Sequence, residues 1–372
     1  MIPLHLPYYS QSARDSVKNF VLGLNEKNFH AELKERFQKS FSFKNSYLTK
    51  SCTNALEVIA LLMDVKIGDE IIIPSYTFVS TANAFAIFGA KIVYADSLEN
   101  NPNADTQSIL NSITPKTKAI VVMHYGGVAI DNLNELRKVC DEKNIYLIED
   151  AAHCIGAYLT NQHLGTFGHA STFSFHESKN ITCIEGGLLV INHQPWLDKV
   201  DAILNKGTNR VQFEKKQAAF YEWVSLGSSF LMNPLHAAIL VEQIKYVDEV
   251  NKKRVEIFNL YCQKLESLKR QKKIYFSIPE SEKQHNAHNF WITLPNENER
   301  NSLQKHLTSK QIFSTFHYLA LHISPFGKRF GEFNLPNSVK FEKTLLRLPL
   351  YYQQTNAQVD EVCQTLNEYF QR

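Results

Sequence analysis

The stretch from Lys50 to Asn192 alternates short apolar runs with segments of helical pattern, and this alternation limits the possible folds more than any other feature. Strands that alternate with helices favour a mostly parallel sheet with helical crossovers. The run at 119–126 is almost continuously apolar, as expected for a strand that is covered on both faces. We therefore predict an α/β fold in which helices flank a mostly parallel central sheet. Further strands are expected at residues 71–74, 90–96, 145–150, 171–176 and 188–191.

The remaining length indicates a second, smaller unit. The chain has 372 residues, of which 44% are hydrophobic and 21% are charged, an ordinary globular composition. A long amphipathic pattern from Pro234 to about Leu268 is the expected connector between the two units. We predict a large domain with an N-terminal arm at 1–235 and a smaller C-terminal α/β domain at 236–372. Helices are expected at residues 16–25, 31–40, 131–144, 299–311 and 356–369, the third of them capped by Asp131.

Charge and cysteine usage exclude several classes of protein. The formal net charge is +3, and the chain has no basic run of the kind that marks nucleic-acid binding. No uninterrupted apolar stretch is long enough to span a bilayer, and residues 1–7 lack the features of a signal peptide. The six cysteines include no C-x-x-C pair, which favours reduced thiols in a cytoplasmic protein. We expect no metal site, and neither nucleic acid nor membrane as a partner.

The segment from Ser171 to Asn180 combines a strand with a lysine at its carboxyl end. Aromatic and polar residues alternate at 173–176 with the period of two that is typical of a strand, and a polar turn that contains Lys179 follows. Taken alone, this lysine is best interpreted as a solvated surface residue, because lysines are mostly exposed. A second stretch of the sequence changes that interpretation.

This second stretch, 145–153, is an apolar strand that ends in two acids, two alanines and a histidine. Its second acid, Asp150, lies 29 residues before Lys179. Pyridoxal phosphate (PLP) needs an amine with which to form a Schiff base and a carboxylate that keeps its ring nitrogen protonated. The two stretches together therefore indicate PLP chemistry.

At these two stretches the chain resembles the DegT/DnrJ/EryC1/StrS family of sugar aminotransferases. The family motifs Glu-Asp-Ala-Ala-(Gln/His) and Ser-Phe-His-x-x-Lys-Asn stand here at 149–153 and 174–180. The resemblance extends from Met1 nearly to the C-terminus. It implies the fold of the type I PLP-dependent transferases, PLP as the cofactor, and a homodimer with shared active sites.

The resemblance implies three catalytic residues. Lys179 would form the Schiff base with the cofactor and then carry protons, and because one amine fills both roles no second base is required. Asp150 would pair with the protonated ring nitrogen and remain ionised beside that cation. His176 is expected to face the same cleft, without an assigned role.

Ser51 precedes the apolar run at 55–63 and is typical of a helix N-cap. A cap alone predicts only the start of a helix, but the resemblance places the phosphate-binding turn on Cys52 and Thr53. Free N–H groups and the helix dipole there would bind the phosphate. An aromatic residue at a strand end is usually part of the core, whereas the resemblance assigns Phe78 to stacking on the cofactor ring.

Three further cofactor contacts follow from the resemblance. His153 stands where many relatives have glutamine and is expected near the phenolic oxygen of the ring, and Ser174 is implied as a phosphate ligand. Ser229 lies in a loop, 226–232, that reaches the PLP phosphate of the neighbouring subunit in the family. An asparagine is usual at that position, and serine has the shorter reach. A lone histidine such as His288 is expected to be structural.

Two segments are candidates for substrate binding. The turn from Lys206 to Arg210 is by itself best interpreted as a solvated loop. The resemblance instead implies that these two residues contact substrate phosphates across a subunit interface. His317, Tyr318 and His322 fall in a stretch that the family uses near its substrate.

The resemblance is strongest to transaminases that act on a 4-oxo-6-deoxy sugar. The expected reaction converts dTDP-4-dehydro-6-deoxy-D-glucose and L-glutamate to dTDP-4-amino-4,6-dideoxy-D-galactose and 2-oxoglutarate, for surface polysaccharide biosynthesis. Alternatives within the family act at C3 or on a UDP-linked sugar. A third alternative is a PLP-binding regulator without catalysis. The lysine and the nearly unbroken set of site residues argue against it, and relatives that act as dehydratases carry histidine where Lys179 stands.

Overall fold

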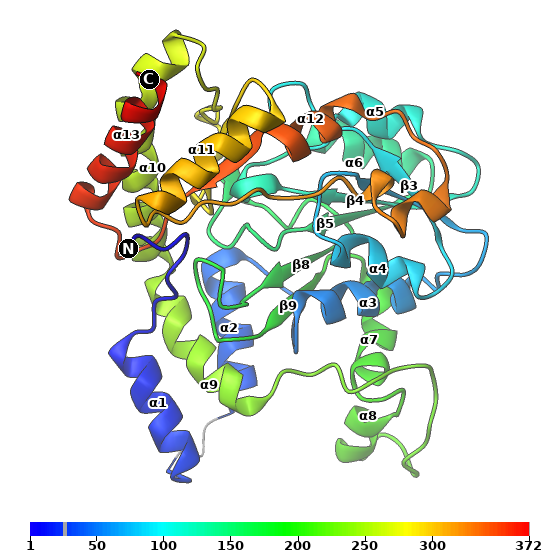
Figure 1. Ribbon diagram of the computed structural model, residues 1–372. Helices are drawn as coiled ribbons and strands as arrows, with labels where there is room; N and C mark the ends of the chain where they lie inside the picture. The colour runs from blue at the N-terminus through cyan, green and yellow to red at the C-terminus, as the bar shows by residue number, and fades with distance from the viewer. Residues whose placement is uncertain (25–27, 372) are drawn as a thin grey trace.

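The computed structural model describes residues 1–24 and 28–371, and its centre is one large twisted sheet (Figure 1). The sheet has seven strands, which are β1 (Ser46–Thr49), β2 (Glu70–Pro74), β3 (Lys91–Ala95), β4 (Thr117–Met123), β5 (Tyr146–Asp150), β8 (Ala170–Ser174) and β9 (Gly187–Ile191). Their spatial order is β1-β9-β8-β5-β4-β2-β3. Strands β3, β2, β4, β5 and β8 pair in parallel, whereas β9 is antiparallel to both of its neighbours. The predicted α/β fold with a mostly parallel sheet is confirmed.

Helices cover both faces of this sheet, so the large unit has three layers (Figure 1). One core contains buried side chains from α1 (Gln11–Val21), α2 (Phe29–Phe41), α5 (Thr106–Asn111), α6 (Leu133–Glu142) and α9 (Pro234–Gln243). The core on the opposite face contains side chains from α3 (Cys52–Leu62), α4 (Ser80–Ala86) and α7 (Leu197–Leu204).

Strand β4 shows why its sequence is continuously apolar. Ile120 and Val122 belong to the first core, while Ala119 and Val121 belong to the second. Successive side chains of a strand point to opposite faces, so a strand between two helical layers must be apolar at every position. Full burial of each branched side chain contributes roughly 1.5–3 kcal/mol to the free energy of unfolding.

A third core defines the smaller C-terminal unit. It forms around the antiparallel pair β11 (Phe290–Thr293) and β12 (Leu345–Leu348) and the helices α10 (Val247–Arg270), α11 (Glu297–Ser309) and α13 (Asn356–Phe370). Ile2 also belongs to it and pairs with Ile312. The remaining elements are β6 (Tyr158–Leu159), β7 (Gln162–His163), β10 (Lys283–Gln284), α8 (Arg210–Glu214), α12 (Pro336–Thr344) and the short 3-10 helices Tyr125–Gly127, Gln194–Trp196, Ile244–Tyr246, Leu321–Ile323 and Gly327–Phe330.

The long helix α10 takes part in two cores. Its first turns place Val247 and Val250 in the core of the large sheet, whereas its side chains from Ile257 onward lie in the third core. The buried apolar side chains of α9 also belong to this first core, where the helix packs on α1 and α2. This packing favours a domain boundary within α10 rather than at residue 235.

Two local expectations need correction or restriction. Asp131 does not cap α6: the N-cap is Asn132, without a side-chain hydrogen bond, and the Asp131 carboxylate accepts a hydrogen bond from Lys283 instead. An ammonium competes well for a carboxylate because the hydrogen bond is charge-assisted. The helix expected from residue 16 begins at Gln11, with Ser10 as its cap, and its expected end at residue 25 lies outside the described residues. Among the described helices none is long and apolar enough to cross a membrane.

Candidate active site

A cavity of about 600 Å³ lies where the parallel strands of the large sheet end. Met123, Asp150 and Ser174 are the last residues of β4, β5 and β8, and all three line it. Ligands of open parallel sheets bind beyond the carboxyl ends of the strands. The structure brings most of the predicted site residues to this one cavity, namely Cys52, Thr53, Phe78, Asp150, His153, Ser174, His176, Lys179, His317 and Tyr318.

Lys179 lies in the wall of the cavity with a free amine. Its Nζ makes no hydrogen bond or ion pair with any residue in the described ranges. Burial lowers the pKa of the Lys179 ammonium from 10.5 to about 8; the positive charge of Arg347 lowers it further, while Cys52 and Asp150 oppose the shift. The interpretation of Lys179 as a solvated surface lysine is therefore wrong, and its amine is poised to lose a proton near neutral pH.

Asp150 is a buried carboxylate that has hydrogen-bond donors but no cation. Its Oδ2 accepts a hydrogen bond from Thr81 Oγ1 at 2.7 Å, and its Oδ1 accepts one from the backbone N–H of Ala152 at 3.2 Å. It forms no ion pair with any residue that the structure describes. Burial raises the pKa of Asp150, against the two hydrogen bonds and the charge of Lys179, which lower it. A cation placed beside this carboxylate would keep it ionised.

The N-terminus of α3 offers free backbone donors to the same cavity. Ser51 caps the helix by accepting a hydrogen bond from the N–H of Asn54 at 3.1 Å, as predicted. The N–H groups of Cys52 and Thr53 have no acceptor among the described residues. The turn packs tightly on β9, where a Cβ at Gly187 would lie 2.3 Å from the carbonyl carbon of Ser51. Free N–H groups at a helix N-terminus are suited to an anion such as a phosphate.

Aromatic and imidazole rings form another part of the cavity wall. Phe78 is 56% exposed and therefore has a free face at the cavity, so it is not a core residue. The imidazole of His153 stacks on that of His288 with ring centroids 4.0 Å apart. His153 Nδ1 accepts a hydrogen bond from the N–H of Gly126, which leaves the ring proton on Nε2, 3.3 Å from Tyr318 Oη. Burial lowers the pKa of both histidines far below the usual range, so both rings are neutral.

His176 is an exposed residue of the cavity rim. Its Nδ1 lies 2.9 Å from Ser178 Oγ, and the contact holds the ring against the turn that carries Lys179. Its side chain does not touch Asp150 or Lys179 through any hydrogen bond that the described residues make. Its expected position is therefore consistent with the structure, and a chemical role for it stays open.

Four predicted residues lie outside the cavity. Arg210 is on α8, where its Nε pairs with Glu214 at 2.7 Å. The helix α8 belongs to the extended connection between α7 and α9 (Figure 1), and Lys206 and Ser229 belong to this connection by their positions in the sequence. Their predicted contacts to a partner's cofactor and to the substrate stay predictions. His322 is buried beside Ser75, whose Oγ lies 2.6 Å from its Nδ1, so its ring faces the protein interior.

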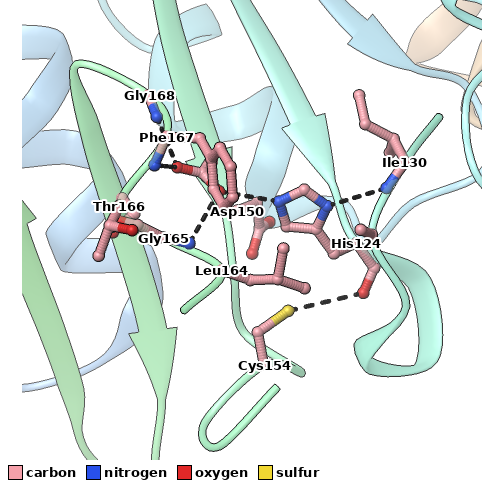
Figure 2. A network of polar contacts seen from close by, with 12 residues as sticks. His124, Ile130, Asp150, Cys154, Leu164, Gly165, Thr166, Phe167 and Gly168 are labelled. Atoms are coloured by element: carbon pink, nitrogen blue, oxygen red, sulfur yellow. Dashed lines mark hydrogen bonds and ion pairs between the residues drawn. The ribbon is translucent and has the colours of Figure 1, made fainter. Parts of the chain in front are cut away.

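A second buried carboxylate fixes the strand that carries Asp150 (Figure 2). Glu149 and His124 are both fully buried, with Oε2 and Nε2 3.0 Å apart. Three backbone N–H groups of the turn 165–168 donate to the Glu149 carboxylate at distances between 2.6 and 2.8 Å. His124 Nδ1 accepts a hydrogen bond from the N–H of Ile130, so its proton is on Nε2 and points at Glu149. Because neighbouring residues of a strand face opposite ways, this network also fixes the direction of Asp150.

Two residues of the site carry no sequence signal. Thr81 donates to Asp150 from within α4, and Arg347 lies on β12, about 170 residues beyond Lys179, whose pKa it lowers. Neither belongs to a motif or to a distinctive local pattern. Only the packing of α4 and β12 brings them to the cavity region.

The family assignment agrees with this geometry. The model of the DegT/DnrJ/EryC1/StrS aminotransferase family matches residues 11–367, and the chain belongs to this family. Family members use PLP, and the free amine of Lys179, the uncompensated carboxylate of Asp150 and the free N–H groups of α3 fit that cofactor. The chain is thus an aminotransferase by family, with PLP as its cofactor.

Individual relatives are similar over their whole length. The uncharacterized protein MJ1066 of Methanocaldococcus jannaschii is 28% identical over 363 residues, which are 94% of this chain and 91% of that protein. The aminotransferase TlmJ of Streptoalloteichus hindustanus has a TM-score of 0.91 at 23% identity, covering 100% of this chain and 99% of its own. Helicobacter pylori PseC, an aminotransferase involved in the biosynthesis of pseudoaminic acid, has a TM-score of 0.89 at 21% identity, covering 100% and 99%. At these identities the structural likeness establishes the fold alone.

Proposed function

We propose that this protein transfers an amino group from L-glutamate to C4 of a nucleotide-linked 4-oxo-6-deoxy sugar, with dTDP-4-dehydro-6-deoxy-D-glucose as substrate and dTDP-4-amino-4,6-dideoxy-D-galactose as product. The observation that carries the proposal is the single cavity in which Lys179, Asp150 and the N-terminus of α3 meet. The sequence resemblance to transaminases of this kind supports the choice of sugar. PseC, which is similar in fold, is an aminotransferase involved in the biosynthesis of pseudoaminic acid, and another chain of similar fold is a sugar aminotransferase, which supports a sugar substrate in general.

The residues of the chain divide the chemical work between them. Bound PLP supplies an electron sink that stabilises negative charge at the carbon from which a proton is taken. Asp150 holds a proton at the ring nitrogen, because its buried carboxylate has no other cation among the described residues. The amine of Lys179 has a pKa of about 8. It would take a proton from one reacting carbon and return a proton to another.

The other residues bind and shield the reacting groups. The free N–H groups of Cys52 and Thr53, together with Ser174, would bind the cofactor phosphate, and their position in the wall of the cavity supports this. The free face of Phe78 would cover the ring and exclude water. His317 and Tyr318 line the same cavity and would contact the sugar.

A homodimer is part of the proposal. The loop that contains Lys206, Arg210 and Ser229 exposes several large apolar side chains to solvent in the single chain, namely Phe213, Phe220, Tyr221, Trp223, Val224 and Leu226. These side chains all belong to residues 213–226, and an exposed apolar patch favours contact with another chain. In a two-fold symmetric dimer this loop would meet the partner and bring Ser229 near the partner's cofactor phosphate.

A cytoplasmic location of the enzyme is also part of the proposal.

Mass spectrometry of the products from a panel of nucleotide oxo-sugars tests the substrate. The panel contains dTDP- and UDP-linked sugars with the oxo group at C3 or at C4, each incubated with L-glutamate and the holoenzyme. We expect a mass gain that corresponds to replacement of the oxo oxygen by an amine for the dTDP-linked 4-oxo sugar. Preference for a 3-oxo or UDP-linked sugar would instead favour the alternative within the family, and no product at all would favour a non-catalytic PLP-binding protein.

A further inference from the structure

The Asp150 carboxylate receives one hydrogen bond from a side chain, and that side chain is Thr81. The distance between Thr81 Oγ1 and Asp150 Oδ2 is 2.7 Å, and the other donor is the backbone N–H of Ala152, 3.2 Å from Oδ1. No other described side chain donates to Asp150. A short O–H···O⁻ contact of this kind is roughly twice as strong as a hydrogen bond between neutral groups.

We propose that Thr81 is a positioning residue that holds Asp150 ionised and aimed at the ring nitrogen of the bound cofactor. Thr81 has no direct contact with the cavity, because it is fully buried in α4 behind the carboxylate. Its effect on the cofactor therefore passes through Asp150. The inference concerns the cofactor end of the site and is independent of which sugar the enzyme accepts.

The hydrogen bond to Asp150 fixes the direction of a second contact that the Thr81 hydroxyl makes. Thr77 Oγ1 lies 3.0 Å from Thr81 Oγ1, and Thr77 belongs to the bend that precedes α4. A hydroxyl has one proton to donate, so Thr81 can donate to Asp150 only if its own oxygen accepts from Thr77 or from nothing. The result is a short chain in which Thr77 donates to Thr81 and Thr81 donates to Asp150. This arrangement favours the ionised carboxylate, which accepts and has nothing to donate.

The chemistry of the cofactor explains why such a donor matters. Burial alone raises the pKa of Asp150, and the Thr81 hydrogen bond is the largest of the opposing effects. A carboxyl group that takes up a proton can no longer stabilise a proton on the ring nitrogen. The electron sink then weakens, because the sink depends on a positively charged ring. Loss of the Thr81 hydroxyl is therefore expected to act at the ring nitrogen and nowhere else on the cofactor.

This specificity distinguishes a positioning role from a merely structural one. The test compares the binding of two cofactors to the cofactor-free full chain by equilibrium fluorescence titration. One is PLP, and the other is an analogue in which a C–H group replaces the ring nitrogen. The variants are Thr81→Val, which keeps the side-chain shape and removes the hydroxyl, and Thr81→Ser, which keeps the hydroxyl. Thr365→Val is the matched control, because Thr365 is also a buried helical residue whose hydroxyl donates, there to the carbonyl of Glu361 at 2.8 Å.

We expect Thr81→Val to weaken the binding of PLP by about tenfold, as loss of a hydrogen bond to a charged group would. It should weaken the binding of the analogue by less than about twofold, since the analogue has no ring proton for Asp150 to hold. Thr81→Ser should keep most of the affinity for PLP, and Thr365→Val should change neither affinity.

Equal weakening for both cofactors, or for neither, would overturn the proposal. So would a wild-type chain that binds the two cofactors equally, because Asp150 would then make no contact with the ring nitrogen. Circular dichroism establishes that each variant is folded, and Thr81→Ala replaces Thr81→Val should the larger side chain prevent folding. A wrong choice of sugar in the proposed function leaves all of these readouts unchanged, so failure of one idea is distinct from failure of the other.

Discussion

The cavity at the end of the sheet and the loop from 205 to 232 differ in how complete they are within one chain. At the cavity, Asp150, Lys179 and the free N–H groups of α3 already face one another. In the loop, Arg210 pairs with its neighbour Glu214 and faces solvent, among exposed aromatic side chains. Residues at the ends of hydrogen-bonded strands are positioned by the sheet itself, whereas a loop with an exposed apolar surface needs a partner to give it a fixed environment.

The backbone hydrogen bonds of the two regions explain why the cavity is more complete within one chain than the loop is. Asp150 pairs in register with Met123 on one side and with Thr172 on the other, and Glu149 anchors the same strand from the opposite face. Ser229 lies outside the sheet: it forms an isolated bridge to Asn205, and the carbonyls of its neighbours Ser228 and Phe230 accept hydrogen bonds from backbone N–H groups. Substitutions at the cavity should therefore act within one chain, and substitutions in the loop should act through the dimer.

The largest effect is expected at Lys179. Replacement by alanine removes both the amine that binds the cofactor and the proton carrier, so we expect transamination to fall by at least about 10⁴-fold. The exposed Lys199 is a control, and Lys199→Ala should keep full activity. Borohydride reduction followed by peptide mapping should find the cofactor on Lys179. An adduct on another lysine would show that Lys179 does not form the Schiff base.

A smaller loss is expected at Asp150. Asp150→Asn keeps the shape of the side chain but removes the charge, so we expect a loss of about 10²–10³-fold in turnover, the size expected when a preorganised charge is removed. Some cofactor should remain bound, as seen in the visible absorption spectrum. Turnover near that of the wild type would mean that the ring nitrogen pairs with a different carboxylate.

In the loop, the exposed indole of Trp223 tests the dimer directly. Trp223→Asp places a charge in the proposed interface, and we expect the dissociation constant of the dimer to rise by at least about 30-fold, the size of an interface hot spot. Sedimentation equilibrium measures it. Ile67 is even more exposed but lies outside this loop, between α3 and β2, so Ile67→Asp is the control and should leave the dimer intact. A wild-type protein that is monomeric would contradict the proposed dimer, because the loop would then have no partner chain.

Mixing two inactive variants tests whether the two regions meet across the dimer. Lys179→Ala chains and Ser229→Trp chains are dissociated together and allowed to re-associate. If sites are shared, each hybrid dimer holds one site with both defects and one with neither, so about a quarter of the wild-type activity should return. Folded, dimeric mixtures that stay inactive would mean that each site belongs to one chain.

The smallest effect is a shift in pH dependence. The neutral amine of Lys179 is the form that reacts with a cofactor aldehyde, so the rate of PLP capture by the cofactor-free chain should rise with pH and level off above a midpoint near 8. Since the charge of Arg347 lowers the pKa of Lys179, Arg347→Met should move this midpoint upward. Stopped-flow absorbance measures the rate; a downward shift would contradict the assigned electrostatics.

The sequence predicts those parts of the molecule that depend on local pattern. The Ser51 cap, the strand that ends at Asp150 and the turn with Lys179 are all set by neighbouring residues, and each stands where it was expected. His317 and His322 show the limit of this approach. They lie five residues apart in one stretch, yet the first lines the cavity and the second turns inward to Ser75.

Long-range packing explains the other differences. Thr81 reaches Asp150 only because α4 lies over the end of β5, and Lys283 draws Asp131 away from the helix it was expected to cap. No local sequence pattern predicts either contact, because the two residues of each pair are more than sixty residues apart in the chain. The division of the chain at residue 235 stays a prediction, and the packing of α9 and of the first turns of α10 favours a later boundary.

The contribution of helix α10 to two cores affects how the protein unfolds on heating. Its first turns are part of the core of the large sheet and its later turns part of the C-terminal core, and a helix of 24 residues unwinds cooperatively. Disorder in one core therefore removes support from the other. We expect a single calorimetric transition in which both units unfold together. A fragment that begins after residue 235 should not fold on its own, because the apolar side chains in the first turns of α10 would lack the core of the large sheet against which they pack.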